Sequence, residues 1–168
     1  MKLRTILAGL ALSLIFAATP ALAQTADDAA PKKQERVKFD PKRDPAKDLQ
    51  AAVVKAKKEN KRILLDVGGE WCGWCKLLDQ YFIDKKDIGA YLNTNYIVVK
   101  VNFSPENENK AFLGAFPKIE GYPHFFVLEK DGKFLHSQNT ALLEEGQGYS
   151  DEKMMTFLKK WAPPKSIR

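Results

Sequence analysis

Residues 63–76 read ILLDVGGEWCGWCK, and this stretch joins a short apolar run to a glycine pair and then to two cysteines three positions apart. The residues over 63–67 are typical of a strand that is covered on both faces, although one carboxylate, Asp66, interrupts the run. The glycines end this strand, and a helix is predicted over about 71–82. Both cysteines therefore lie where a strand passes into a helix.

Helix and strand patterns alternate along the rest of the chain. Asp44 and Pro45 are typical of a helix cap and a first helical position, and apolar residues then recur at helical spacing. The further predicted elements are helices over 44–60, 85–92, 106–116 and 150–162 and strands over 96–102, 124–129 and 134–138. The last two strands form a hairpin about the Asp131-Gly132 turn. This order predicts an α/β fold, a sandwich in which helices cover both faces of a central mixed sheet.

The composition is that of one globular domain. The 168 residues include 27 Lys and Arg, 21 Asp and Glu and only two Cys, with a formal net charge of +6. Hydrophobic residues make up 45% of the chain, enough to bury a core, which excludes full-length disorder. Two cysteines cannot form a disulfide framework. Because acids are interspersed with the bases, we expect no nucleic-acid partner. We also expect a monomer.

The N-terminus has the pattern of a secretory signal. Lys2 and Arg4 precede an uncharged run over 6–18, and in Ala21-Leu22-Ala23 small residues stand at the positions that a signal peptidase reads. An uncleaved membrane anchor is the alternative, but a helix over 6–18 rises only about 20 Å, short of the roughly 30 Å hydrocarbon core. We therefore expect residues 1–23 to be a cleaved signal peptide and the mature protein to be periplasmic and soluble.

Three further segments are expected after the signal. Residues 24–43 are polar, charged and broken by two prolines, and Val37 and Phe39 are their only large apolar side chains. We predict a flexible charged arm there, and whether Phe39 packs on the domain is left open. The domain itself is predicted over 44–162, with a C-terminal tail over 163–168.

The cysteine pair has the spacing of a reversible disulfide, because two sulfurs three residues apart can close a small ring and open it again. Cys72 is placed at the helix start, where free N–H groups and the helix dipole favour a thiolate, so it is the predicted nucleophile. Cys75 lies one turn further in and is placed to resolve a mixed disulfide. A permanent structural bridge is the alternative, but closing so short a loop gains little stability.

A metal site is a second alternative, since two thiolates with His124 and His136 would nominally supply four ligands. The spacing does not follow a zinc-finger pattern. If Asp131-Gly132 centres its turn, His136 pairs near Val127 and lies about 10 Å from His124 along the ladder. We therefore expect no bound metal and no cofactor other than the redox-active cysteine pair.

The second informative residue is Asp66, because a charge inside a buried strand is unfavourable unless it is neutralised, paired or hydrogen-bonded. It stands six residues before Cys72 and could take the proton of Cys75 through a water as that thiol attacks. The alternative is that Asp66 faces solvent at the strand end. Lys100, alone in the apolar strand over 96–102, is either its partner or a side chain that extends to water.

The third informative residue is Pro123, since a proline at the start of a strand leaves unpaired backbone, and its peptide bond can be cis. The sequence does not show the isomer. The sequence leaves two interpretations open for Trp71 and Trp74, which are ordinary packing and contact with substrate.

Four separated features together resemble the thioredoxin superfamily. They are residues 64–76 with the cysteine pair, Lys100 on the next strand, Gly121-Tyr122-Pro123, and the Lys130-Asp131-Gly132-Lys133 turn. The resemblance covers about 44–161 and extends to secreted thioredoxin-like proteins, such as the periplasmic end of transmembrane disulfide-reducing relays. It implies a thioredoxin-like sandwich in which the catalytic residues are Cys72, Cys75, Asp66 and Lys100. It also implies that Pro123 is a cis-proline that pairs substrate backbone. The predicted substrate-binding residues are then Trp71, Gly73, Trp74, Tyr122, Pro123 and His124.

Two departures from the family pattern bear on function. Gly73 and Trp74 separate the cysteines, where common thioredoxins have Gly-Pro and strong oxidants usually carry a histidine. Tyr122 before Pro123 is bulkier than the usual Thr or Val, and His124 after it is expected to line the groove. The redox potential and the substrate preference can therefore differ from those of common thioredoxins.

The resemblance implies an exported thiol:disulfide oxidoreductase that acts on protein disulfides or thiols. We expect a reductase, with a membrane electron relay as its partner. An isomerase is disfavoured, because the arm over 24–43 is too short for a dimerisation domain. The alternative from another class is a thioredoxin-like metallochaperone, or a non-enzymatic adaptor that binds a partner segment beside Pro123.

Overall fold

The computed structural model describes residues 35–164, and within them a four-stranded sheet has the strand order β2-β1-β3-β4. The strands are β1 (Arg62–Gly68), β2 (Tyr96–Asn102), β3 (His124–Leu128) and β4 (Phe134–Asn139). β1 and β2 run parallel, whereas β3 pairs antiparallel with both β1 and β4. The sheet is therefore mixed, as the sequence predicts.

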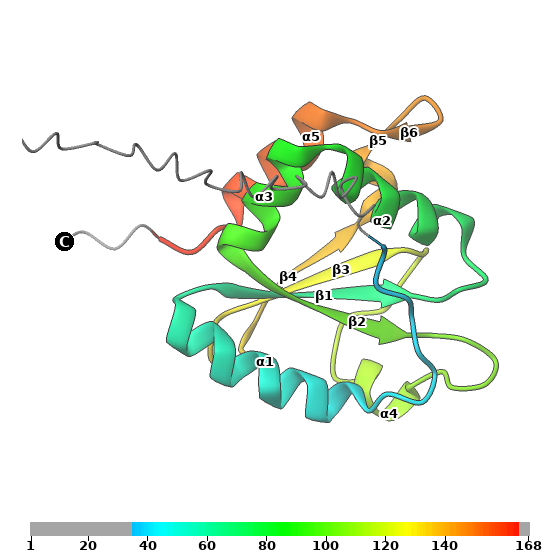
Figure 1. Ribbon diagram of the computed structural model, residues 1–168. Helices are drawn as coiled ribbons and strands as arrows, with labels where there is room; N and C mark the ends of the chain where they lie inside the picture. The colour runs from blue at the N-terminus through cyan, green and yellow to red at the C-terminus, as the bar shows by residue number, and fades with distance from the viewer. Residues whose placement is uncertain (1–34, 165–168) are drawn as a thin grey trace, which may run out of the picture. The chain divides into compact units, whose positions relative to one another are not determined.

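Helices cover both faces of this sheet (Figure 1). On one face lies α1 (Pro45–Glu59), and on the other lie α2 (Gly73–Asp84), α3 (Lys86–Asn95) and α5 (Asp151–Lys160). Each face has its own cluster of buried apolar side chains. The predicted α/β sandwich is confirmed.

The apolar run in β1 is nearly continuous because its side chains serve both cores. Leu64 belongs to the cluster on the side of α2, α3 and α5, whereas Ile63, Leu65 and Val67 belong to the cluster on the side of α1. All four are fully buried. Because side chains alternate along a strand, Asp66 lies on the same face as Leu64, on the side of α2.

The helix α1 begins and ends where the sequence predicts. The carboxylate of Asp44 accepts hydrogen bonds from the backbone N–H groups of Ala46 at 3.0 Å and Lys47 at 3.3 Å, and Pro45 occupies the first helical position. Asn60 ends the helix with a left-handed backbone, φ 51°.

The predicted helix over 106–116 is wrong for most of its length, because only α4 (Lys110–Leu113) is helical. The side-chain amide of Asn107 donates to the carbonyl of Pro41 at 2.8 Å, and that of Asn109 donates to the carbonyl of Asn102 at 2.7 Å. Asparagine side chains that bond to backbone in this way compete with helix formation. This segment is therefore a loop joined to β2.

The hairpin of β3 and β4 has the predicted register, with Val127 opposite His136. Between β4 and α5 the chain forms elements that the sequence analysis missed. They are the 3-10 helix η1 (Thr140–Leu143) and a small hairpin of β5 (Glu144–Glu145) and β6 (Gly148–Tyr149). Strands of two residues are too short to carry a recognisable alternation.

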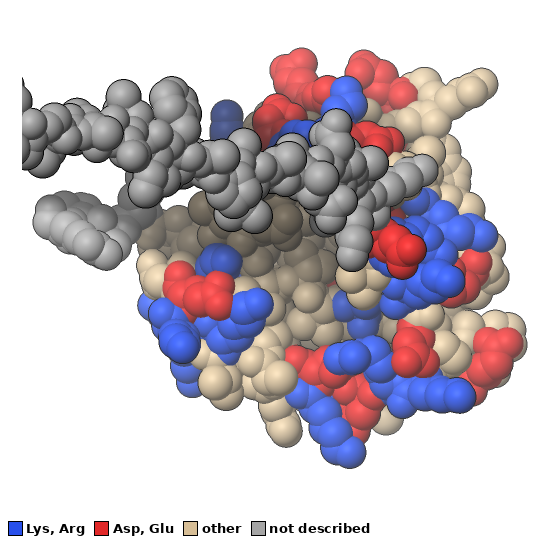
Figure 2. All heavy atoms as spheres, viewed as in Figure 1, with Lys and Arg blue, Asp and Glu red and all other residues tan. Residues whose placement is uncertain are grey.

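The part of the chain that the structure describes has no helix long and apolar enough to cross a membrane. The predicted signal peptide over 1–23, the first part of the predicted arm and the end of the predicted tail lie outside residues 35–164. On the face viewed in Figure 2, basic and acidic side chains are interspersed, as they are along the sequence.

Candidate active site

Cys72 and Cys75 form a disulfide at the start of α2, with their Cα atoms 5.2 Å apart. Cys72 is the N-cap of this helix, and its sulfur accepts a hydrogen bond from the backbone N–H of Cys75 at 3.0 Å. That N–H is one of the groups that a helix leaves free at its N-terminus. A thiolate on Cys72 would therefore meet both a donor and the positive end of the helix dipole.

Both cysteines are nearly covered, Cys72 with 4% and Cys75 with 1% of its surface exposed. They share an apolar cluster with Phe39, and the half-buried side chains of Trp74 and Tyr122 pack against it. The space in front of Gly73 is open, since a Cβ atom there would meet nothing within 4 Å. Free space therefore adjoins the turn between the two cysteines.

Three aromatic rings form one wall beside the pair. Trp71 is exposed and meets Tyr122 edge-on with ring centroids 5.6 Å apart, and its indole N–H donates to the carbonyl of Phe103 at 2.6 Å. Phe103 stacks on Tyr122 at 4.8 Å. Trp74 packs instead against Tyr149, at 5.6 Å. The two tryptophans thus stand in different surroundings, and only Trp71 presents most of its surface to solvent.

Pro123 is buried at the start of β3, and the Tyr122–Pro123 peptide bond is cis. The carbonyl of Pro123 accepts a hydrogen bond from the hydroxyl of Thr140 at 2.5 Å. The structure thus brings Tyr122 to the cysteine cluster, and Pro123 follows it directly along the chain.

The expectation that His124 lines the groove is wrong, because its side chain is buried. Its ring packs against Phe126 with centroids 4.8 Å apart, and its Nε2 shares a hydrogen bond with the hydroxyl of Ser137 at 2.8 Å. The alternation along β3 places His124 on the same face as Phe126, in the core on the α1 side. Burial, with a smaller effect of His136, lowers the pKa of His124 to about 4, so the ring is neutral at neutral pH.

The solvent-facing alternative for Asp66 is also wrong, because its carboxylate is buried and paired with the Lys100 ammonium at 2.9 Å. Lys100 is therefore its partner rather than a side chain that extends to water. The other carboxylate oxygen of Asp66 is buried and has no hydrogen-bond partner among the described residues. An unsatisfied acceptor of this kind is unfavourable unless a proton or a water reaches it.

Asp79 is a second buried acid, which the sequence analysis missed. It also accepts a hydrogen bond from Lys100, and it lies on α2 one turn after Cys75. Burial first, and the charge of Asp66 second among the raising effects, place its pKa above the ordinary value of 3.8. Burial alone would lower the pKa of Lys100, but the two carboxylates outweigh it and raise that pKa. Lys100 therefore stays charged between two acids.

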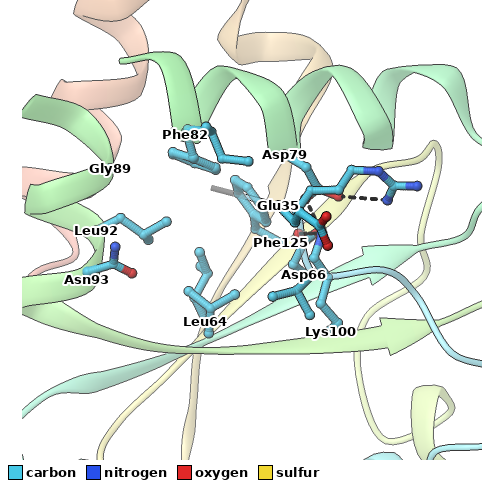
Figure 3. Close-up of a pocket in the computed structure, with 14 residues that line it drawn as sticks. Glu35, Leu64, Asp66, Asp79, Phe82, Gly89, Leu92, Asn93, Lys100 and Phe125 are labelled. Atoms are coloured by element: carbon cyan, nitrogen blue, oxygen red, sulfur yellow. Dashed lines mark hydrogen bonds and ion pairs between the residues drawn. The ribbon is translucent and has the colours of Figure 1, made fainter. Parts of the chain in front are cut away.

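A cavity of about 190 Å³ adjoins this charge cluster, between the sheet and the helices α2 and α3 (Figure 3). Asp66, Asp79 and Lys100 gather at one end of it. Leu64, Phe82 and Leu92 line its apolar remainder. Arg36 and Val37 also line this cavity.

The segment over 35–43 is packed on the domain, so the predicted flexible arm is wrong for this part of 24–43. Phe39 is only 3% exposed, and its backbone N–H donates to the carboxylate of Glu70 at 2.9 Å. Arg36 pairs with the same carboxylate and reaches Asp79 at 3.4 Å. Burial of the Phe39 ring and the ion pairs of Arg36 together offset the conformational entropy that this polar segment loses when it is ordered.

Docking of this segment should be lost in acid. The hydrogen bond from Arg36 lowers the pKa of Glu70 from 4.5 to about 2. A carboxyl whose pKa is lower in the folded than in the unfolded state contributes its full stabilisation at a pH above the unfolded-state pKa. This stabilisation is lost as the pH falls through the folded-state pKa. We expect the NMR signals of the Phe39 ring to move toward unfolded positions between about pH 4.5 and 2. In Glu70→Gln they should already be shifted at pH 6, and signals unchanged in both would contradict the pairing.

Among residues 35–164, no three His, Cys, Asp or Glu side chains come close enough together to hold a metal ion. The two histidines are three ladder positions apart, since His136 lies opposite Val127. The chemistry that the described arrangement offers is disulfide exchange beside a buried acid.

Comparisons with known proteins agree with this geometry. The family described as Thioredoxin-like matches residues 44–130. The mouse (Mus musculus) protein Spermatogenesis-associated protein 20 is 45% identical over 53 residues, which are 32% of this chain and 7% of that protein. Thioredoxin-3, mitochondrial, of Saccharomyces cerevisiae is 29% identical over 92 residues, 53% of this chain and 65% of that protein. The match thus spans less than two thirds of either relative.

Two solved structures have the same arrangement of elements. The disulphide isomerase from Xylella fastidiosa Temecula1 is 26% identical, with a TM-score of 0.63, over 73% of this chain and 94% of that chain. The oxidised C-terminal domain of DsbD from Neisseria meningitidis is 19% identical, with a TM-score of 0.50, over 73% of this chain and 98% of that chain. The second similarity concerns the fold alone.

Proposed function

Because the chain belongs to the thioredoxin-like family, we propose that it is an exported thiol:disulfide oxidoreductase that exchanges disulfides with protein thiols through Cys72 and Cys75. One observation carries this proposal. The two sulfurs are bonded at a helix start, and the Cys72 sulfur accepts the N–H of Cys75. Such a site can stabilise a thiolate on Cys72 when the bond opens.

The first step is attack on a client disulfide. In the reduced protein, the Cys72 thiolate bonds to one client sulfur, the client S–S bond breaks, and the other client sulfur leaves as a thiolate. The result is a mixed disulfide between Cys72 and the client. Because the approach in front of Gly73 is open, the client chain can reach Cys72 from that side.

The second step is resolution by Cys75. Its thiol loses a proton, its sulfur bonds to that of Cys72, and the bond between Cys72 and the client breaks. The client gains two electrons and this protein returns to the disulfide form. Asp66, buried with one unpartnered carboxylate oxygen, is the proposed acceptor of the proton through a water.

We propose that the net direction is reduction. No histidine stands between the cysteines to stabilise the Cys72 thiolate further, and a less stabilised thiolate makes a less oxidising pair. Outside the cytoplasm such a reductase needs electrons, which a membrane relay would supply. The similar protein from Xylella is named a disulphide isomerase, and an isomerase also exchanges disulfides. A reduction potential near the roughly −120 mV of a strong oxidant would contradict the direction.

Trapping in cells tests the function directly. In Cys75→Ser the first step proceeds but resolution does not, so mixed disulfides with clients should accumulate and be released by a reductant. The Cys72→Ser/Cys75→Ser variant is the matched control and should capture none. Stoichiometric metal in the purified protein, lost in Cys72→Ser, would favour the metallochaperone instead.

The mass of the purified protein tests export, since cleavage after Ala23 leaves Gln24 as the first residue.

Asp66→Asn should slow resolution at neutral pH by about tenfold or more, because a positioned base contributes 10²–10⁴-fold in typical cases. The fold should be no less stable, since three carboxylates share two cations in this network. Single-turnover release of client thiol, followed from pH 5 to 9, gives the rate. Asp87→Asn, at an exposed position on α3, is the control. Equal resolution rates in Asp66→Asn and the natural protein at every pH would contradict the proposed role of Asp66.

A further inference from the structure

Phe39 lies outside the segment that matches the family, yet its ring is part of the redox site. It belongs to the same buried cluster as Cys72 and Cys75. The ammonium of Lys100 stands 4.1 Å from the centroid of its ring. The ring thus contacts the disulfide and also borders the charge cluster of Asp66, Lys100 and Asp79.

The outer end of the Phe39 ring and the Cys75 sulfur lie close to the same point, Gly68 at the end of β1. A Cβ atom at Gly68 would lie 2.5 Å from the Cys75 sulfur and 3.1 Å from the outer carbon of the Phe39 ring. The strand end, the Cys75 sulfur and this ring therefore meet at one point, and a side chain at position 68 would not fit there. Cys72 belongs to the same cluster, but it is the N-cap of α2 and is followed by Gly73, where a Cβ atom would meet nothing within 4 Å.

The ring is held in place by the loop that carries the cysteines. Glu70, two residues before Cys72, accepts hydrogen bonds from the Phe39 backbone N–H and from Arg36. Arg36 also reaches Asp79 on α2. The segment is thus anchored at two points, one on each side of the disulfide in the sequence.

We propose that Phe39 is a positioning residue that directs thiol attack to Cys72 by covering Cys75. This proposal rests on the function proposed above. When a thiolate of the electron-donating partner attacks the disulfide, it bonds to the Cys72 sulfur, the Cys72–Cys75 bond breaks, and Cys75 leaves as a thiolate that takes up a proton. Which sulfur is attacked depends on access, so an uncovered Cys75 would be attacked as well. Such attack would leave the electron-donating partner bonded to Cys75 instead of Cys72.

The first test measures how readily Cys75 reacts. In the full chain carrying Cys72→Ser, the only thiol is that of Cys75, and its rate with 5,5′-dithiobis(2-nitrobenzoic acid) is followed by absorbance. Adding Phe39→Ala should raise this rate by about tenfold or more, because exchange depends on access to the sulfur. Phe39→Leu, which keeps an apolar cover, should restore most of the protection. Val37→Ala, at a side chain that is 71% exposed, is the matched control and should change nothing.

The second test locates the attack. The oxidised protein, with both cysteines present, is treated with limiting glutathione and quenched by alkylation. Fragmentation of the peptide over 63–76 then shows which sulfur carries glutathione. We expect Cys72 alone in the natural chain and both sulfurs in Phe39→Ala. Loss of general stability alone would not change this ratio while the protein stays folded.

Arg36→Ala keeps the proposal testable if Phe39→Ala fails to fold. It removes an anchor of the segment without opening the core, and it should also raise the reactivity of Cys75. Unchanged Cys75 rates in both variants, with glutathione on Cys72 only, would overturn the proposal. Because the Cys75 rate is measured without turnover, it tests the cover even where the cysteine pair fails to act on clients.

Discussion

Cys72→Ser should reduce insulin-disulfide reduction to the uncatalysed background, a loss of on the order of 10³-fold or more. The variant removes the sulfur of the N-cap of α2, where the N–H of Cys75 can stabilise a thiolate. Cys75 is not an equivalent replacement, because it is buried in the first turn of α2, in a cluster with Phe39. The turbidity of precipitating insulin chains gives the rate.

The matched control for this prediction is Cys75→Ser. It keeps the nucleophile, so one equivalent of client should be captured as a mixed disulfide before turnover stops. A chain with Cys72→Ser that still turned over at the natural rate would refute the assignment of Cys72 as the nucleophile. Equal behaviour of the two single variants would show that their roles are not distinct.

Lys100→Met should destabilise the fold by about 3–5 kcal/mol, because removing one partner of a buried ion pair leaves its charge uncompensated. In this protein two buried carboxylates, those of Asp66 and Asp79, lose the cation that lies between them. The methionine keeps most of the volume of the lysine stem, so the loss reports charge rather than packing. Urea denaturation at neutral pH gives the free energy of unfolding.

The pH dependence of Lys100→Met has a definite sign. The pKa of Asp79 is already raised in the natural protein, by burial and by Asp66, so the folded state holds its proton more tightly than the unfolded state. Stability at such a group increases as pH falls through the raised pKa. The deficit of Lys100→Met should therefore shrink in mild acid. Adding Asp66→Asn to Lys100→Met should recover part of the lost stability at neutral pH. A free energy of unfolding of Lys100→Met within about 1 kcal/mol of that of the natural protein would contradict the account.

The cysteine site could be predicted because its signals are local in the sequence. The glycine pair and the CxxC spacing place both sulfurs at a strand-to-helix junction, and the structure has them there. Asp66 could be predicted because a single charge in an apolar run must be compensated. Its pairing with Lys100 follows from the parallel register, in which the two residues are directly opposite each other.

Asp79 was missed because a single acid in a helix is a weaker sign of a buried charge than a single acid in a short apolar strand. It stands among the buried residues of that helix, with Leu78 and Tyr81, at helical spacing from Cys75. An acid on the apolar face of a helix that begins with the cysteines could have been singled out. The sequence alone does not show that this face points toward Lys100.

The other differences arise where tertiary contacts outweigh local composition. Phe39 is a lone aromatic in a polar segment, and its burial depends on Glu70 and Arg36, which are 34 positions apart. His124 was misplaced although the start of β3 was predicted correctly, because the sequence does not show that its ring packs on Phe126 and bonds to Ser137 of the neighbouring strand. The helix predicted over 106–116 failed because asparagine side chains bond to the backbone of β2 and of the segment before α1.

The central claim is that Cys72 and Cys75 interconvert between disulfide and dithiol while the fold persists. Equilibration in buffers of graded dithiothreitol and its disulfide, followed by alkylation and mass measurement, tests it most directly. The account predicts a single reversible two-electron transition, with the circular dichroism of the fold retained on both sides and no transition in Cys72→Ser. A pair that stays oxidised at every potential up to unfolding, or one that stays reduced throughout, would contradict it.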